Sequence, residues 1–137
     1  MAAGDYLRVG TKRICSCPKL LRTNPKRSFF TPERCYIVEL ENSNDDEGCS
    51  IAHARVRPGV TTQLHAAKNA TERYVILEGE GKAEIGGGVP TIVRPLDVVA
   101  IPAEVSQRIT NIGKTNLIFL CVCTPRFRPE SYLDMSS

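Results

Sequence analysis

The chain has 137 residues with a formal net charge of +3, and 42% of them are hydrophobic and 24% charged. This length and composition fit one globular domain with a substantial core. The small charge and the lack of a recognised nucleic-acid module argue against nucleic-acid binding. The sequence contains no apolar run of about 18 residues that would cross a membrane and no secretory signal at its start, so we expect a cytoplasmic protein.

Short stretches rich in β-branched and aromatic residues follow one another along the chain, separated by Gly, Pro and Asn. Such stretches predict strands rather than helices. The expected strands cover residues 35–40, 49–57, 63–67, 73–78, 82–85, 90–94, 97–101, 106–111 and 117–123. Many short strands at even spacing are typical of an all-β sandwich or barrel.

We expect three regions along the chain. Residues 1–34 would form an N-terminal strand or arm that packs on the barrel, and residues 35–125 would form the barrel itself. Residues 126–137 would be a short helical or irregular tail, with the only helix candidate at residues 129–135.

The six cysteines stand at positions 15, 17, 35, 49, 121 and 123. In a protein that is not exported they are expected to be reduced thiols. Cys121 and Cys123 lie in the apolar run LIFLCVC, where cysteine packs as a small hydrophobic residue. Cys15 and Cys17 have basic neighbours, and the sequence leaves their role open. Both Cys-x-Cys pairs are closer in sequence than the usual pair of zinc ligands.

The most informative stretch is residues 58–81, PGVTTQLHAAKNATERYVILEGEG. Five residues separate Gly59 from His65, and six separate Glu72 from Gly79. Histidine and glutamate side chains are both common metal ligands. Ala67 stands two residues after His65, on the same face of the expected strand, and its methyl group offers no ligand.

This spacing resembles the first motif of the cupin superfamily, in which Gly, His-x-His, Glu and Gly follow at these intervals. The segment PLDVVAIPAEVSQRITN resembles the second motif at Asp97, Pro102 and Asn111. The resemblance covers about residues 36–125. It implies an all-β fold, the double-stranded β-helix, also called the jelly-roll or cupin barrel.

The second motif also departs from the family pattern at three positions. Leu96 and Glu104 stand where the family commonly has glycine, and Gln107 stands where it has histidine. The resemblance thus implies metal ligands at His65, Glu72 and Gln107, with a fourth ligand lost at Ala67. Loss of two imidazoles removes donors that transition metals favour, so a divalent metal (Fe, Mn, Zn or Ni) and a metal-free pocket both stay open.

Alternation along the strands suggests which further side chains point into the barrel. Glu72 shares a strand face with Tyr74 and Ile76, and Gln107 shares one with Ile109 and Asn111. His53 is a further candidate, from the strand before the motif. The predicted pocket residues besides the metal set are His53, Tyr74, Ile76, Ile109 and Asn111.

Three functions are compatible with these residues. The first is binding of a small polar or anionic metabolite in a barrel whose metal site is degenerate. The second is a metal-dependent enzyme of the dioxygenase, isomerase or lyase type that uses a His/Glu/Gln centre. The third is metal-free acid–base catalysis, with His65 as base, Glu72 beside it and Tyr74 as a candidate acid. The resemblance implies a homodimer, but it does not choose a reaction, so enzymatic activity stays open.

Overall fold

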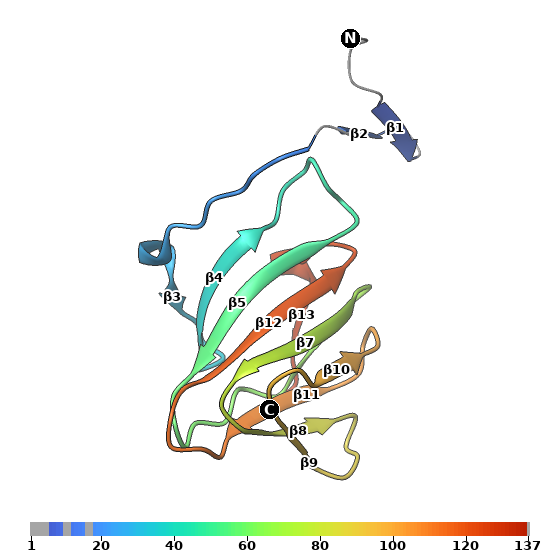
Figure 1. Cartoon of the computed structure of the whole chain (residues 1–137). Coiled ribbons are helices and arrows are strands. Elements are labelled where there is room, and N and C mark those ends of the chain that lie inside the picture. Colours follow the sequence, from blue (N-terminus) through green and yellow to red (C-terminus); the bar gives the residue numbers. More distant parts are fainter. Residues whose placement is uncertain (1–5, 10–11, 16–17, 137) are drawn as a thin grey trace.

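The computed structural model describes residues 6–9, 12–15 and 18–136, which form two large antiparallel β-sheets and a separate hairpin (Figure 1). The larger sheet has six strands in the order β10–β7–β12–β5–β4–β3, and the smaller has five in the order β13–β6–β11–β8–β9. The prediction of an all-β double-stranded β-helix is therefore confirmed. Within the described ranges, no helix has the length and apolar character needed to cross a membrane.

The strands are short and follow one another at close intervals. The six-stranded sheet contains β3 (Phe29–Phe30), β4 (Tyr36–Glu41), β5 (Ser50–Val56), β7 (Thr71–Glu78), β10 (Val98–Ile101) and β12 (Leu117–Thr124). The five-stranded sheet contains β6 (His65–Ala67), β8 (Gly81–Ile85), β9 (Thr91–Val93), β11 (Gln107–Asn111) and β13 (Tyr132–Asp134). All nine predicted strands correspond to observed ones, with ends that differ by at most two residues.

The described strands before residue 35 belong to two different sheets. Strands β1 (Tyr6–Val9) and β2 (Lys12–Cys15) pair with each other in a sheet of their own, which stands apart from the two larger sheets in Figure 1. Strand β3, by contrast, pairs with β4 and belongs to the six-stranded sheet. The six-stranded sheet thus begins at Phe29, within the region that the sequence predicts to be a strand or arm packing on the barrel. The side chains of Cys15 and Cys17 lie outside the described part of the chain.

The C-terminal residues are part of the barrel rather than an irregular tail. Strand β13 pairs with β6, and Tyr132 lies directly opposite Ala67. Backbone hydrogen bonds from Lys68 N to Ser131 O and from Met135 N to Leu64 O, 2.7 and 3.0 Å long, hold it there. The predicted helix at residues 129–135 is reduced to one 3₁₀ turn, Pro129–Ser131, because pairing with β6 satisfies the following backbone groups.

The core lies between the two large sheets. Ile76 and Phe119 contribute from the six-stranded sheet, and Ala83 and Ile109 from the five-stranded sheet. Full burial of an isoleucine side chain contributes about 1.5–3 kcal/mol of transfer free energy. The core also borders the cavity described below, since Phe119 and Tyr74 belong to both.

Two turns adopt a backbone conformation that usually requires glycine. Leu96 has φ 76° in the turn closed by Asp97 N and Arg94 O, and Glu104 has φ 68° in the turn between Pro102 and Val105. A positive φ at the third residue is the mark of a type II turn. The fold therefore keeps the turn geometry at both positions where the family resemblance places glycine.

Candidate functional site

The register of the six-stranded sheet brings a row of polar side chains into the barrel. Glu72 of β7 lies opposite Cys123 of β12, and Cys123 lies opposite Ser50 of β5. One pleat further along, Tyr74 lies opposite Cys121. Because residues two apart share a face, both rows point to the same side of the sheet. They line a cavity of about 460 Å³ between the sheets.

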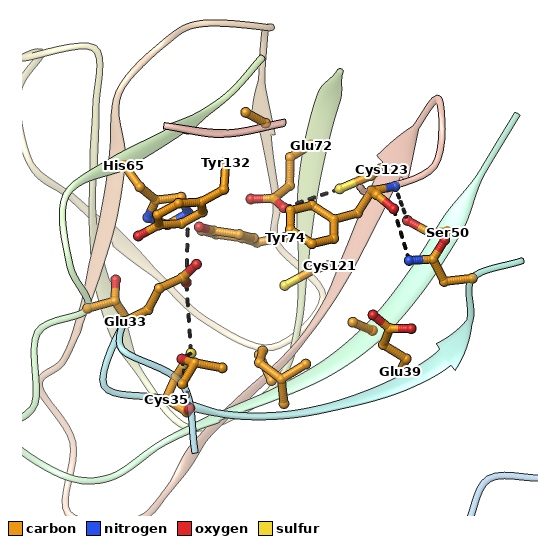
Figure 2. A pocket seen from close by; sticks show the side chains of 18 of the residues that line it. Glu33, Cys35, Glu39, Ser50, His65, Glu72, Tyr74, Cys121, Cys123 and Tyr132 are labelled. Carbon is orange, nitrogen blue, oxygen red and sulfur yellow. Dashed lines mark hydrogen bonds and ion pairs between the residues drawn. The ribbon is translucent and has the colours of Figure 1, made fainter. Parts of the chain in front are cut away.

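The cavity wall combines aromatic rings with acidic and thiol groups (Figure 2). The rings belong to Phe29, Tyr74, Phe119, Phe127 and Tyr132. The carboxyl groups belong to Glu33, Glu39 and Glu72, and the thiols to Cys35, Cys121 and Cys123. No lysine or arginine is among the described residues that line it. The wall is therefore mostly apolar, and its ionisable groups other than His65 are acids.

His65 is buried and held in one orientation. Its Nδ1 atom lies 2.7 Å from the carbonyl oxygen of Gln63. A carbonyl only accepts hydrogen bonds, so Nδ1 carries the proton and a neutral ring presents its lone pair at Nε2. Nε2 lies 3.9 Å from Oε2 of Glu33. The ring stacks on Tyr132 with centroids 5.2 Å apart, as Figure 2 shows.

Glu33 is a candidate site residue that sequence reasoning missed. It lies in the loop between β3 and β4, and its carbonyl accepts a hydrogen bond of 3.1 Å from Gln63 N. Burial raises the pKa of Glu33, His65 lowers it, and the Glu72 carboxyl raises it further. No sequence signal marks a single glutamate in a polar loop. It reaches the site only because the loop folds across the barrel toward β6.

Glu72 is held inside the barrel by a thiol rather than by a cation. The Cys123 thiol donates a hydrogen bond of 3.2 Å to Oε2 of Glu72. Burial raises the pKa of Glu72, and this hydrogen bond and the nearby His65 offset part of the rise. A buried carboxylate without a cationic partner is costly, so the protonated form is favoured while the cavity is empty, and a positive charge beside it would favour the carboxylate.

Gln107 lies behind the cavity wall. It is fully buried, and the Tyr74 hydroxyl donates a hydrogen bond to its Oε1 atom. The Gln107 and Tyr74 side chains lie near enough to Glu72 to lower its pKa, yet Nε2 of Gln107 completes no hydrogen bond. Burial raises the pKa of Tyr74, so this phenol stays a hydrogen-bond donor. The amide oxygen that would bind a metal is thus already engaged.

The position of Ala67 has become part of an aromatic wall. Ala67 lines the cavity, and Tyr132 lies directly opposite it in the neighbouring strand. The small methyl group leaves space for the Tyr132 ring, which stacks on His65. The hydroxyl of Tyr132 is buried without a hydrogen-bond partner. An imidazole at position 67 would compete with this ring for space.

These residues do not fit the divalent metal that the resemblance implied. His65 Nε2 faces the carboxyl of Glu33, Glu72 accepts from a thiol, and the Gln107 oxygen accepts from a phenol. Among the described residues, no group of three or more His, Cys, Asp or Glu side chains is arranged to hold a metal ion. The arrangement is that of hydrogen-bonded acids in an apolar pocket.

Of the other predicted pocket residues, only Tyr74 lines the cavity. Ile76 and Ile109 belong to the packed core. The Asn111 amide donates to the carbonyl oxygens of Val56 and Thr115, both at 2.8 Å, so it fastens the barrel end. His53, which the sequence placed in the pocket, does not line the cavity. It lies between Ala52 and Ala54 of β5, which both line the cavity, so the His53 side chain points outward.

The fold and the cavity between its sheets define this chain as a protein of the double-stranded β-helix class. Residues 52–123, more than half of the chain, match the family described as the cupin domain (Cupin_2), so the chain belongs to the cupin family. It is 32% identical over 106 residues to the uncharacterized protein MJ1618 of Methanocaldococcus jannaschii, covering 76% of this chain and 84% of that protein. The predicted family membership is confirmed.

Solved structures show the same architecture. A predicted oxalate decarboxylase of Thermotoga maritima superposes with a TM-score of 0.61 and 27% identity, over 66% of this chain and 80% of that one. An uncharacterized conserved protein with a double-stranded β-helix domain from Klebsiella pneumoniae superposes with a TM-score of 0.65 and 15% identity, over 76% of this chain and 87% of that one. The second likeness concerns the fold alone.

Proposed function

We propose that this chain binds a small, mainly apolar organic molecule in the barrel cavity without a resident divalent metal. The observation that carries the proposal is the cavity of about 460 Å³, whose wall is mostly aromatic and aliphatic with a few grouped polar side chains. Binding sites for small molecules are typically apolar cavities of about 300–1,000 Å³ with few polar groups that set orientation. His65, Glu33 and Glu72 supply those groups.

The wall argues against the anionic ligand that the sequence suggested. An anion needs positive groups, whereas Glu33, Glu39 and Glu72 line the cavity and no described lysine or arginine does. Repulsion by ionised carboxyl groups and the lack of a lysine or arginine would both weaken its binding. A dianion such as oxalate, which is named for the Thermotoga protein, is therefore a poor fit to this cavity.

A ligand screen with two matched variants tests the binding proposal. Ala52 lines the cavity and His53, its neighbour, points outward, so leucine at each position adds bulk on opposite faces of one strand. In a thermal-shift and calorimetric screen of neutral organic fragments, we expect wild-type binding that falls at least tenfold in Ala52→Leu and stays unchanged in His53→Leu. A folded wild-type protein that binds no fragment would contradict the proposal, as would equal loss in both variants.

Elemental analysis tests the metal-free part. Protein purified without chelators should contain far less than one equivalent of Fe, Mn, Zn or Ni. One equivalent that is lost in a folded Glu72→Ala variant would instead support the predicted His/Glu/Gln centre. The reason for the expectation is that Gln107 and Glu72 already have hydrogen-bond partners within the protein.

A second function, proton transfer without a metal, is favoured by the geometry of His65. The Gln63 carbonyl fixes the proton on Nδ1, so Nε2 faces Glu33 as a candidate base. Glu33 thus takes the place that the sequence assigned to Glu72. Once a bound compound with an exchangeable C–H is known, NMR should show deuterium uptake in D₂O that is lost in His65→Gln while binding persists. Equal uptake in both proteins would exclude this function.

We also propose that the chain forms a homodimer through the outer face of the six-stranded sheet. The register aligns one outward row across five strands, and four of its members are apolar. This row is Val38, His53, Leu120, Val75 and Val98. Apolar faces of this kind usually mark protein contacts. Light scattering after gel filtration should give twice the chain mass for wild type and one chain mass for Leu120→Glu; a monomeric wild type would refute the dimer.

A further inference from the structure

The charges around the cavity are unbalanced. Three glutamates line it, and His65 is the one lining side chain, among the described residues, that is able to carry a positive charge. Arg126 and Arg128 are not among the lining residues, and both pair with Glu47 instead. The cavity therefore has acidic groups without a permanent cation of the protein.

The three carboxyl groups also lie at different places around the cavity. Glu33 faces His65 of the five-stranded sheet, and Glu72 lies on β7 of the six-stranded sheet, beside Cys123. Glu39 is exposed to solvent in β4, next to Ala52, and Figure 2 shows it well away from Glu33. A positive ligand that enters past Glu39 would meet carboxyl groups along its path. Their number and spread favour a ligand of several atoms over a single ion.

Aromatic rings fill the space between these carboxyl groups. Tyr74 and Phe119 pack with centroids 4.7 Å apart and planes at 49°, and Tyr132 stacks on His65. Ring faces attract organic cations within about 6 Å of the centroid, most strongly where water is excluded. A bare metal ion gains little from rings, since it requires several oxygen, nitrogen or sulfur ligands.

We propose that the ligand of this cavity is a small organic cation, a quaternary ammonium or a protonated amine, held by the aromatic rings and by the carboxylates of Glu33 and Glu72. This inference rests on the proposed binding function and specifies its ligand class. Binding supplies the positive charge that the protein lacks, and the rings contact the alkyl groups around the nitrogen. An anion or a neutral compound of the same shape gains only the apolar contacts.

Isosteric probes separate the charge from the shape. Choline, its neutral carbon isostere 3,3-dimethylbutanol and the anion 3,3-dimethylbutanoate have similar size, and isothermal titration calorimetry of the wild-type protein measures each. We expect choline to bind at least tenfold more tightly than the alcohol, and the anion to bind most weakly. Equal or tighter binding of the alcohol or the anion would overturn the cation while leaving the binding function standing. Binding of none of the three and of no neutral fragment would overturn both.

Variants test the named carboxyl groups. Glu33→Gln and Glu72→Gln keep the side-chain shape and remove the charge, so each should weaken choline about tenfold and leave the alcohol within twofold. Glu84→Gln is the matched control, because Glu84 pairs with Arg108 at 2.8 Å outside the cavity. Its choline affinity should equal that of wild type. Unchanged choline affinity in both cavity variants, or an equal loss in Glu84→Gln, would refute the assignment.

Discussion

Replacing Leu96 by glycine should make this protein more stable. Leu96 has φ 76° at the third position of a turn whose hydrogen bond joins Asp97 N to Arg94 O at 3.0 Å. Such a turn is built for glycine, since a Cβ atom crowds the backbone at positive φ. The side chain contributes little burial to set against this strain, because 86% of its surface is exposed.

The expected gain follows from two opposing terms. A residue with a Cβ in the left-handed region costs about 1–2 kcal/mol. Glycine opposes this gain by about 0.4–1 kcal/mol, because it increases the conformational entropy of the unfolded chain. The net stabilisation is therefore about 0.5–1 kcal/mol. Glu104, with φ 68° and an exposed side chain, should gain a similar amount from Glu104→Gly.

Urea unfolding measures this difference, provided that the m-value is unchanged. Gly59→Ala is the reverse control: Gly59 has φ 78°, and an added Cβ atom would meet no atom within 4 Å. This variant thus reports the cost of the backbone conformation alone, and we expect it to lose about 1 kcal/mol. If Gly59→Ala shows that loss while Leu96→Gly is less stable than wild type, the strain argument for Leu96 is wrong.

Three further predictions concern single residues. Burial raises the pKa of folded Glu72 above its ordinary 4.5, so the stability that this group contributes below pH 4.5 is lost as the pH rises. In urea titrations, Glu72→Gln should therefore gain stability relative to wild type as the pH rises. Arg108 lowers the pKa of Glu84, so Glu84→Gln should instead lose stability relative to wild type over this range. Gly79→Ala should cost about 2–4 kcal/mol in the same assay, because its Cβ would lie 2.7 Å from a backbone oxygen at φ 84°; a cost equal to that of Gly59→Ala would contradict this. Burial raises the pKa of Cys35 to about 12, so peptide mapping after alkylation at pH 8 should find it labelled only in unfolded protein, and rapid labelling of the native protein would refute its burial.

The strand pattern was predictable because its signals are local. Two-residue alternation and turn-forming Gly, Pro and Asn identify a strand without knowledge of its partner. Strands β3 and β13 were missed because they have two and three residues, respectively, and exist through pairing with β4 and β6. Such short segments carry too little pattern of their own.

The sequence by itself determined the barrel, the family and the burial of His65, Glu72 and Gln107, because motif spacing and alternation follow from the covalent chain. Only the tertiary structure decided which atoms meet. It placed Glu33 at Nε2 of His65 and the Tyr132 ring opposite Ala67. Alternation alone sorts the residues of a strand into two faces, and the pairing of whole sheets then selects the face that points inward. A pocket lined by acids and aromatic rings results from those long-range contacts.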